Sequence, residues 1–154
     1  MSALWPRGVE TVDLRIRSDP AHLADMREAV RQMAERCGFA ADETDAVALA
    51  VDEALTNTIK HGYGGSPEGD IDIHLERLAG ELGGGLEVRI RDYGHQVDPE
   101  GICSRDLSDI RPGGLGVHIM RCVMDELRYE RCQGGGMLVT MRKYLTRHGE
   151  SPVG

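Results

Sequence analysis

Apolar residues alternate with polar ones in several stretches of the chain, the spacing of half-buried β-strands. The clearest alternating runs are Val12, Leu14 and Ile16, then Ile71, Ile73 and Leu75, and then Leu86, Val88 and Ile90. The glycine-rich segment 80–85 separates the last two and predicts a hairpin connection. Near the C-terminus, segments 127–132 and 137–144 predict another hairpin, turned by the glycines at 134–136.

Other apolar residues recur at helical spacing and predict three helices. In the first, Leu23, Met26, Val30, Met33 and Cys37 lie on one face, with Ser18-Asp19-Pro20 as a start signal and Gly38 as a stop signal. A second helix is expected from Asp42 to about His61, and a third from near Leu115. Segment 93–112 has no clear period. Because loops of that length are often functional, we expect a lid that orders when a ligand binds.

The predicted order of elements is β-α-α-β-β-α-β-β. Hairpin-linked strands and amphipathic helices favour an α+β fold, a two-layer sandwich with a mixed β-sheet and helices packed on one face. Residues 1–154 are expected to form a single domain, with its core at about 11–144 and a polar tail at 146–154.

The composition of the chain argues against several classes of function. The chain has 154 residues, of which 40% are hydrophobic and 29% charged, and its net charge is −8. This acidic balance argues against nucleic-acid binding, which depends on neutralising phosphates. No stretch is apolar enough to span a membrane and no signal peptide is visible, so a cytoplasmic location is expected. The four cysteines lack a CxxC pair, so reduced thiols, mostly in the core, are expected rather than a zinc site.

The second helix carries two polar residues on a stripe lined by alanines. With about 100° per residue, Glu53 and Asn57 fall on the same side as Ala46 and Ala50, apart from the apolar stripe. A carboxylate and an amide one turn apart can orient a nucleophile and hold Mg²⁺ through oxygen. Taken alone, the pair also fits an ordinary solvated helix face.

Two further motifs suit a nucleotide. Asp92 ends a predicted strand, where its carboxylate could accept a hydrogen bond from an exocyclic amine such as that of adenine, and Gly94 would permit close backbone approach. The run Gly113-Gly114-Leu115-Gly116 opens the third helix, whose N-terminus favours phosphates. Alone, the first motif also fits a plain turn and the second a flexible loop. His61 and His118 are interpreted as structural or solvated.

In this order, the motifs resemble those of the GHKL (histidine-kinase-like) ATPase superfamily and its Bergerat-type ATP-binding fold. The short length and the run Met124-Asp125-Glu126-Leu127 after the last motif point to the branch of anti-sigma-factor serine/threonine kinases. The resemblance extends from Thr11 to Tyr144. The similar segments are Asp52-Glu53-Ala54-Leu55-Thr56-Asn57 with Lys60-His61-Gly62-Tyr63, then Asp92-Tyr93-Gly94-His95-Gln96-Val97-Asp98-Pro99, and then Gly113-Gly114-Leu115-Gly116-Val117-His118-Ile119-Met120.

The resemblance implies a role for each matching residue. Glu53 would be the general base and Asn57 the ligand of Mg²⁺ on ATP. Asp92 and Gly94 would bind adenine, with help from Thr140. Gly113, Gly114 and Gly116 would contact phosphate, and Arg111 or Arg105 would face the terminal phosphate. Gln96 stands where many members of the superfamily have glycine, which disfavours its chaperone and topoisomerase branches.

The resemblance therefore implies an ATP-dependent protein-serine kinase. Its expected substrate is a small STAS-type anti-sigma-factor antagonist, and it could also sequester a sigma factor. Members of this branch usually form homodimers. The alternative hypothesis is a nucleotide-sensing, protein-binding module without significant kinase activity. Glu53 favours the enzyme, because binding ATP alone does not require a base.

Overall fold

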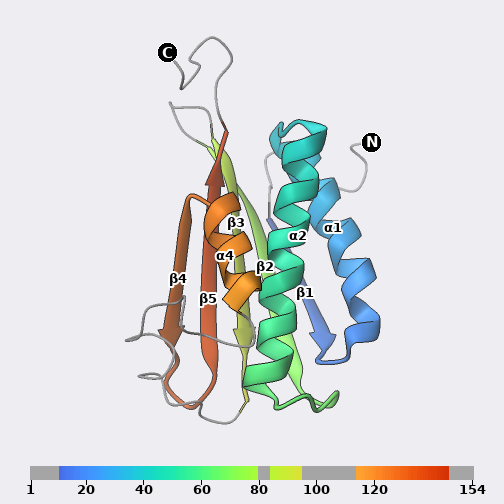
Figure 1. The fold of residues 1–154 in the computed structure, drawn as a ribbon, viewed down its shortest axis with the longest axis vertical. Coiled ribbons are helices and arrows are strands. Elements are labelled where there is room, and N and C mark those ends of the chain that lie inside the picture. Colours follow the sequence, from blue (N-terminus) through green and yellow to red (C-terminus); the bar gives the residue numbers. More distant parts are fainter. Residues whose placement is uncertain (1–10, 80–83, 95–113, 146–154) are drawn as a thin grey trace.

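The computed structural model describes residues 11–79, 84–94 and 114–145. Five strands form one sheet in the order β1-β2-β3-β5-β4 (Figure 1). The strands are β1 (Thr11–Arg17), β2 (Asp70–Leu78), β3 (Gly85–Asp92), β4 (Glu126–Arg131) and β5 (Met137–Tyr144). The strands and both hairpins expected from the alternating pattern are thus confirmed.

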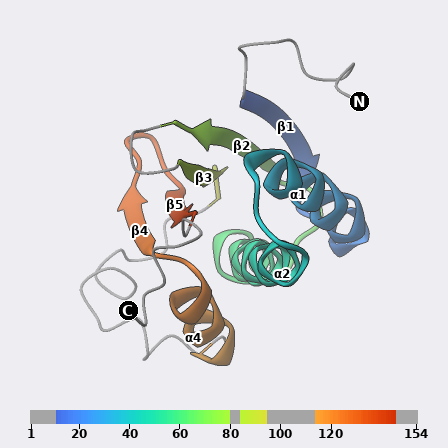
Figure 2. The ribbon, with the colours of Figure 1, turned by 90° about the horizontal axis from the view of Figure 1, so that it is seen from above.

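The helices α1 (Leu23–Cys37), α2 (Ala41–Asn57) and α4 (Gly114–Val123) all cover the same face of the sheet (Figures 1 and 2). This confirms the α+β class and the two-layer arrangement. One detail differs from expectation: every pairing between the described strands is antiparallel, where a mixed sheet was expected. The helices lie in the connections from β1 to β2 and from β3 to β4, and each strand runs antiparallel to the strands beside it.

Local signals set the bounds of the first helix. The Asp19 side chain accepts a hydrogen bond from the backbone N–H of Ala21, and Pro20 opens a short 3₁₀ turn, Pro20–His22, ahead of α1. At the other end, Gly38 has φ 106°, a left-handed conformation that glycine adopts without strain, and its N–H donates to the carbonyl groups of the last turn.

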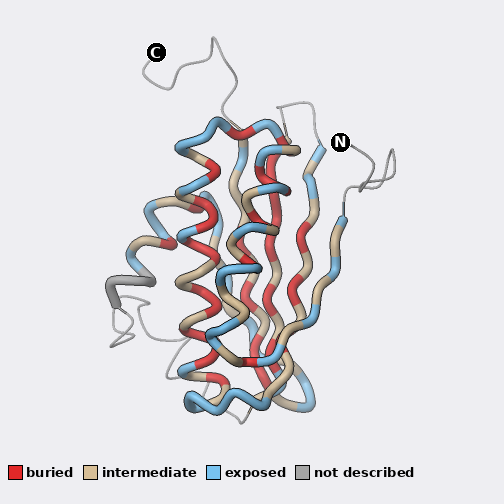
Figure 3. The backbone as a smooth tube through the Cα atoms, turned by 90° about the vertical axis from the view of Figure 1, so that its right-hand side faces the viewer, coloured by how far each residue is buried: buried red, intermediate tan, exposed pale blue. Residues whose placement is uncertain are grey.

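The core lies between the sheet and α2. Val47, Val51 and Leu55 of α2 are at most 1% exposed, and they pack in one cluster with the inward residues of β2 and β3. In β2 and in the second half of β3, buried residues alternate with more exposed ones (Figure 3). The apolar stripe predicted for the second helix is therefore the face that meets the sheet.

The second helix ends differently from the expectation. Its α-helical part stops at Asn57, and Thr58–Gly62 form one π-helical turn. Single π-turns are rare and occur frequently at functional sites. The wider turn carries the chain toward the end of β3, where Gly62 approaches Asp92.

The three described cysteines form no disulfide, and they are less buried than expected. Cys37 lies in the core, whereas Cys122 is exposed on α4 and Cys132 is half-buried beside the β4–β5 turn. Cys103 lies outside the described residues. Within the described ranges, no helix is long and apolar enough to cross a membrane.

The packing of α2 predicts a stability difference between two leucines on the same helix. Leu55→Ala should lower the free energy of unfolding by about 2–5 kcal/mol, because it removes buried methyl groups and leaves a cavity. Leu49→Ala is the matched control: Leu49 is 45% exposed, so its loss should cost far less. Urea denaturation of both variants measures the difference, and equal costs would contradict the assigned faces of α2.

Candidate functional site

Three segments far apart in sequence meet at one end of the sheet. They are the π-helical turn after α2, the end of β3, and the turn between β4 and β5 (Figure 1). Asp92, the last residue of β3, lies where they meet and is 3% exposed. An acidic side chain so deeply buried needs hydrogen-bond partners or an altered pKa.

The Asp92 carboxylate is held by backbone donors. The N–H of Gly94 donates to Oδ1 at 3.0 Å, and the backbone N–H of Met137, the first residue of β5, also donates to this carboxylate. Burial nevertheless raises the pKa of Asp92, against the opposing effects of these two donors and of Arg91. The group is therefore an oriented hydrogen-bond acceptor in a poorly solvated position.

Three glycines allow the segments to close around Asp92. A Cβ atom on Gly62 would lie 3.0 Å from the Asp92 carboxyl carbon. A Cβ on Gly94 would collide with the Gly62 carbonyl oxygen, and one on Gly136 with the Asp92 carbonyl oxygen. Sequence reasoning assigned Gly94 to adenine and Gly136 to the turn of a hairpin, and it gave Gly62 no role of its own in the site. The structure gives all three a shared role in the backbone packing around the carboxylate.

The hydroxyl group of Tyr63 holds the end of β3 in place through two hydrogen bonds. This hydroxyl donates to the Asp70 carbonyl oxygen and accepts the backbone N–H of Tyr93 at 2.7 Å. The residue directly after Asp92 is thereby tied to the residue directly after Gly62. This bridge stabilises the relative positions of β3 and the π-helical turn.

Asn57, the last residue of α2, is 9% exposed, and its Nδ2 has no hydrogen-bond partner within the described part of the chain. Buried amide groups are nearly always paired in folded proteins. This unpartnered amide is the kind of group that a polar ligand would satisfy, and its oxygen is a suitable ligand for a hard cation. Among the described residues, no group of three or more His, Cys, Asp or Glu could hold a metal ion.

Glu53 is half-buried one turn before Asn57, and it forms no hydrogen bond or ion pair with another described residue. The preceding residue behaves differently: Asp52 pairs with Arg27 at 3.1 Å and ties α2 to α1. Glu53 is thus a carboxylate without a structural partner in the described ranges, on the same stripe of α2 as Asn57. Ala46 and Ala50 share that stripe, and Ala50 is fully buried.

His61 lies in the π-helical turn, and its Nε2 is also buried without a partner in the ranges described. Burial lowers the pKa of His61, and the neighbouring Lys60 lowers it further. The interpretation of His61 as structural or solvated does not account for this buried, unpaired nitrogen. The signal available in the sequence was its spacing of four residues from Asn57.

The remaining site residues divide into three groups. Gly114 and Gly116 lie in the first turn of α4, which packs against α2 (Figure 2). Gly113, Arg111, Arg105 and nearly all of the expected lid lie outside the described residues. Thr140 pairs in register with Arg89, and its neighbours Val139 and Met141 are the buried residues of β5.

The position of Thr140 corrects one prediction. Strand side chains alternate between faces, so Thr140 lies on the open face of the sheet with Arg89, whereas Asp92 lies on the helix-covered face with Ile90. Thr140 therefore cannot share an adenine site with Asp92. The residue of β5 that does contact Asp92 is Met137, through its backbone N–H.

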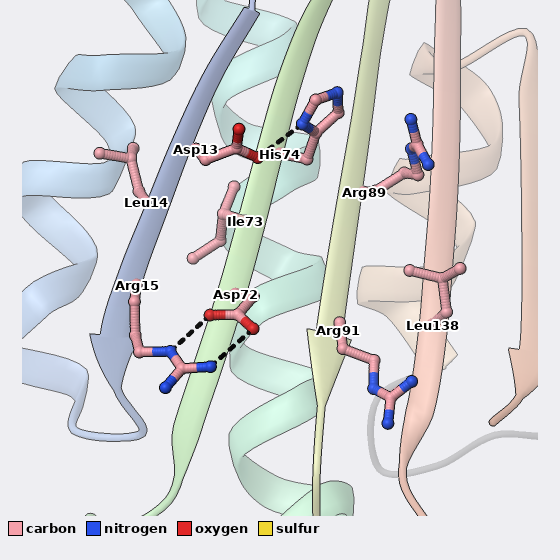
Figure 4. Close-up of a pocket in the computed structure, with 9 residues that line it drawn as sticks. All are labelled: Asp13, Leu14, Arg15, Asp72, Ile73, His74, Arg89, Arg91 and Leu138. Atoms are coloured by element: carbon pink, nitrogen blue, oxygen red, sulfur yellow. Dashed lines mark hydrogen bonds and ion pairs between the residues drawn. The ribbon is translucent and has the colours of Figure 1, made fainter. Parts of the chain in front are cut away.

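The open face of the sheet carries a shallow hollow lined mainly by charged residues (Figure 4). Arg15 donates to both carboxylate oxygens of Asp72 at 2.6 and 2.9 Å, and this pairing is the main reason that the pKa of Asp72 falls to about 2. His74 contacts Asp13 at 2.6 Å. These partly exposed side chains are satisfied by one another, and exposed ion pairs contribute little to stability. This surface is chemically unlike the site around Asp92.

Comparison with known proteins agrees with the fold and the motifs. Residues 16–143 match the family model of the histidine kinase-like ATPase domain. The chain is similar to two proteins named serine-protein kinase RsbW. The Bacillus velezensis protein is 27% identical over 89% of this chain and 87% of its own length. The Listeria monocytogenes protein is 29% identical over 88% of each chain.

A solved structure shows the same fold. It contains the RsbU and RsbW domains of a Mycobacterium tuberculosis protein, with a TM-score of 0.63 and 18% identity. The match covers 89% of this chain but 33% of that longer chain. The likeness is therefore to one part of a larger protein.

The burial of Asp92 predicts the direction in which the pKa of its carboxyl group is shifted. In the folded protein the pKa of Asp92 should lie above its ordinary value of 3.8 because burial disfavours the charged form. Between 3.8 and that raised pKa, the folded state holds a proton that the unfolded chain has released, so the contribution of Asp92 to stability is largest at low pH and is lost as the pH rises.

Carbon-13 NMR of the aspartate carboxyl groups measures this directly. Asp72 serves as the internal control, since its pKa should fall to about 2 beside Arg15. An Asp92 signal that titrated at or below 3.8 would contradict its burial in the folded protein.

Proposed function

The chain belongs to the histidine kinase-like ATPase family, and on that basis we propose that it is an ATP-dependent protein-serine kinase. The observation that carries the proposal is that two groups lie near the same end of the sheet: the oriented, buried carboxylate of Asp92, and the side chain of Asn57, whose Nδ2 has no partner among the described residues. The similarity to proteins named serine-protein kinase supports a serine hydroxyl as the acceptor.

In this proposal Asp92 selects the base. Its carboxylate accepts a hydrogen bond from the amino group of adenine, and a guanine base, which presents a carbonyl oxygen at that position, would be rejected. Because Gly94 and Met137 already orient the carboxylate, little ordering is left for the binding step. Discrimination is strong where a buried polar group would otherwise stay unpaired.

The phosphates would lie nearer to α4 and the end of α2. The backbone at Gly114 and Gly116 would donate to phosphate oxygens from the first turn of α4. Asn57 would hold Mg²⁺ through its amide oxygen, and the ion would offset the charge that gathers on the phosphates. Gly113 and either Arg111 or Arg105 are proposed to complete this part of the site.

Glu53 would act as the base toward the acceptor. Its carboxylate takes the proton of the serine hydroxyl while the serine oxygen bonds to the γ-phosphorus of ATP. The bond from that phosphorus to the bridging oxygen breaks, leaving ADP and a phosphoserine. Glu53 is suited to this step because no described residue neutralises it. A positioned base typically contributes roughly 10²–10⁴-fold to the rate.

The proposed acceptor is a small STAS-type antagonist of an anti-sigma factor, and we propose that the same domain can also sequester a sigma factor. We further propose a homodimer in the cytoplasm. The alternative is a nucleotide-sensing, protein-binding module without significant kinase activity. The two hypotheses differ in their requirement for Glu53: the kinase needs its carboxylate as the base, whereas the sensing module does not.

Loss of the Asn57 amide should weaken ATP binding selectively in the presence of Mg²⁺. Asn57→Ala should lower affinity by about 10–100-fold, the range expected for losing a polar contact to a charged group. Thr56→Ala is the control, because the Thr56 hydroxyl donates to the Asp52 carbonyl within α2. Calorimetry with and without Mg²⁺ provides the measurement, and an unchanged Mg²⁺ dependence in Asn57→Ala would refute the metal role.

Glu53→Gln should keep ATP affinity within a small factor and lose most phosphotransfer, by at least about 10²-fold. Asp52→Asn is the matched control, since its charge pairs with Arg27 and serves helix packing. Radiolabelled ATP and candidate STAS proteins from the same genome provide the assay. Equal rates for Glu53→Gln and wild type would eliminate Glu53 as the base. ATP and partner binding without any transfer by wild type would favour the sensing module.

A further inference from the structure

The side chain of Tyr93, the residue directly after Asp92, lies on the open face of the sheet. Its hydroxyl donates to the Asp72 carboxylate, and the guanidinium carbon of Arg91 lies 4.5 Å from the centroid of its ring. Asp72 and Arg91 are cross-strand partners on that open face. The carboxylate of Asp92 is instead buried on the helix-covered face. The chain is therefore held from both faces of the sheet at this point.

Asp72 is a well-fixed acceptor for the Tyr93 hydroxyl. Both of its carboxylate oxygens accept hydrogen bonds from Arg15 on the neighbouring strand β1 (Figure 4). This pairing is the main reason that the pKa of Asp72 falls to about 2, so the carboxylate is charged at neutral pH. Hydrogen bonds to a charged acceptor are stronger than those between neutral groups.

Arg91 extends the attachment of Tyr93 to the turn between β4 and β5. Its Nε donates to the Asp92 carbonyl oxygen at 3.1 Å, and its Nη2 donates to the Gly135 carbonyl oxygen at 3.2 Å. The guanidinium that makes these bonds also lies against the face of the Tyr93 ring, where a cation is attracted by the aromatic electrons. The ring and the guanidinium thus hold the end of β3 beside the turn.

The residue after Tyr93 supplies a donor that orients Asp92, since the N–H of Gly94 donates to Oδ1 at 3.0 Å. The backbone of Tyr93 joins the carboxylate to this donor, so its conformation decides whether the bond forms. We propose that Tyr93 is a positioning residue of the nucleotide site, an inference that rests on the proposed ATP site. Its side chain, held by Asp72 and Arg91 on the open face, keeps the Gly94 N–H against the carboxylate. Tyr93 itself touches no part of the nucleotide.

Tyr144 provides a matched control on the same face of the sheet. Tyr93 is 46% exposed and Tyr144 is 39% exposed, and the Tyr144 hydroxyl also donates to a carboxylate, that of Glu126. Tyr144 pairs with Gly85 at the opposite end of β3 from Asp92. If the role of Tyr93 were only structural, Tyr93→Phe and Tyr144→Phe would have the same effects on stability and on ligand binding.

The first measurement is amide hydrogen exchange at Gly94, followed by NMR in the absence of ligand. Tyr93→Phe loses the hydroxyl contact and keeps the ring, and it should speed exchange at Gly94 about fivefold. Tyr93→Ala also loses the contact with Arg91 and should speed exchange further. Tyr144→Phe should leave exchange at Gly94 unchanged. Unchanged exchange in both Tyr93 variants overturns the proposal.

Calorimetry with ATP and thermal unfolding complete the test. Tyr93→Phe should bind ATP about fivefold more weakly and Tyr93→Ala about tenfold more weakly or worse. Tyr144→Phe should bind as wild type does, with an unfolding temperature equal to that of Tyr93→Phe. In an Asp72→Ala background the effect of Tyr93→Phe on affinity should disappear, because the hydroxyl has lost its acceptor.

Two further outcomes separate this inference from the function on which it rests. Faster exchange at Gly94 with unchanged ATP affinity overturns the role of Tyr93 in binding and leaves the ATP site in place. Failure of wild type to bind ATP overturns the proposed function and the positioning role with it, whatever the exchange at Gly94 shows.

Discussion

The close backbone approach around the Asp92 carboxylate is the constraint on which the candidate site depends. Gly62, Gly94 and Gly136 let three segments close on one another where a Cβ atom would collide or press on Asp92. The resulting burial would be unfavourable for a carboxylate without partners, and two backbone donors supply them. The same packing orients the acceptor and sets the end of the π-helical turn, and with it the positions of Asn57 and His61.

The site therefore contains buried polar groups that lower the stability of the folded domain. Asn57 and His61 each bury a nitrogen that has no partner among the described residues, and burial raises the pKa of Asp92. The rest of the domain compensates through apolar packing, with Val47, Val51 and Leu55 almost completely buried against the sheet. Functional sites commonly show such unsatisfied groups because their partners arrive with the ligand.

The fold was largely predictable because its elements follow simple periods. Alternation located the strands, and helical spacing together with Gly38 located α1. Contacts between distant segments were not predictable: no local pattern indicated that Gly62 packs on Asp92, or that α2 ends in a π-helical turn. Thr140 shows a different failure, since the alternation of β5 already places it opposite Val139 and Met141 and away from the core face. A match in residue type was given more weight than the strand period.

The central claim is that the nucleotide lies on the helix-covered side of the sheet, at the end where α2, β3 and the β4–β5 turn meet. A crystal structure of the protein with Mg²⁺ and a non-hydrolysable ATP analogue tests this claim most directly. The account predicts the adenine amino group within hydrogen-bond distance of the Asp92 carboxylate and the phosphates on the side of Asn57. A nucleotide bound instead in the charged hollow between Arg15 and Arg91 on the open face would contradict it.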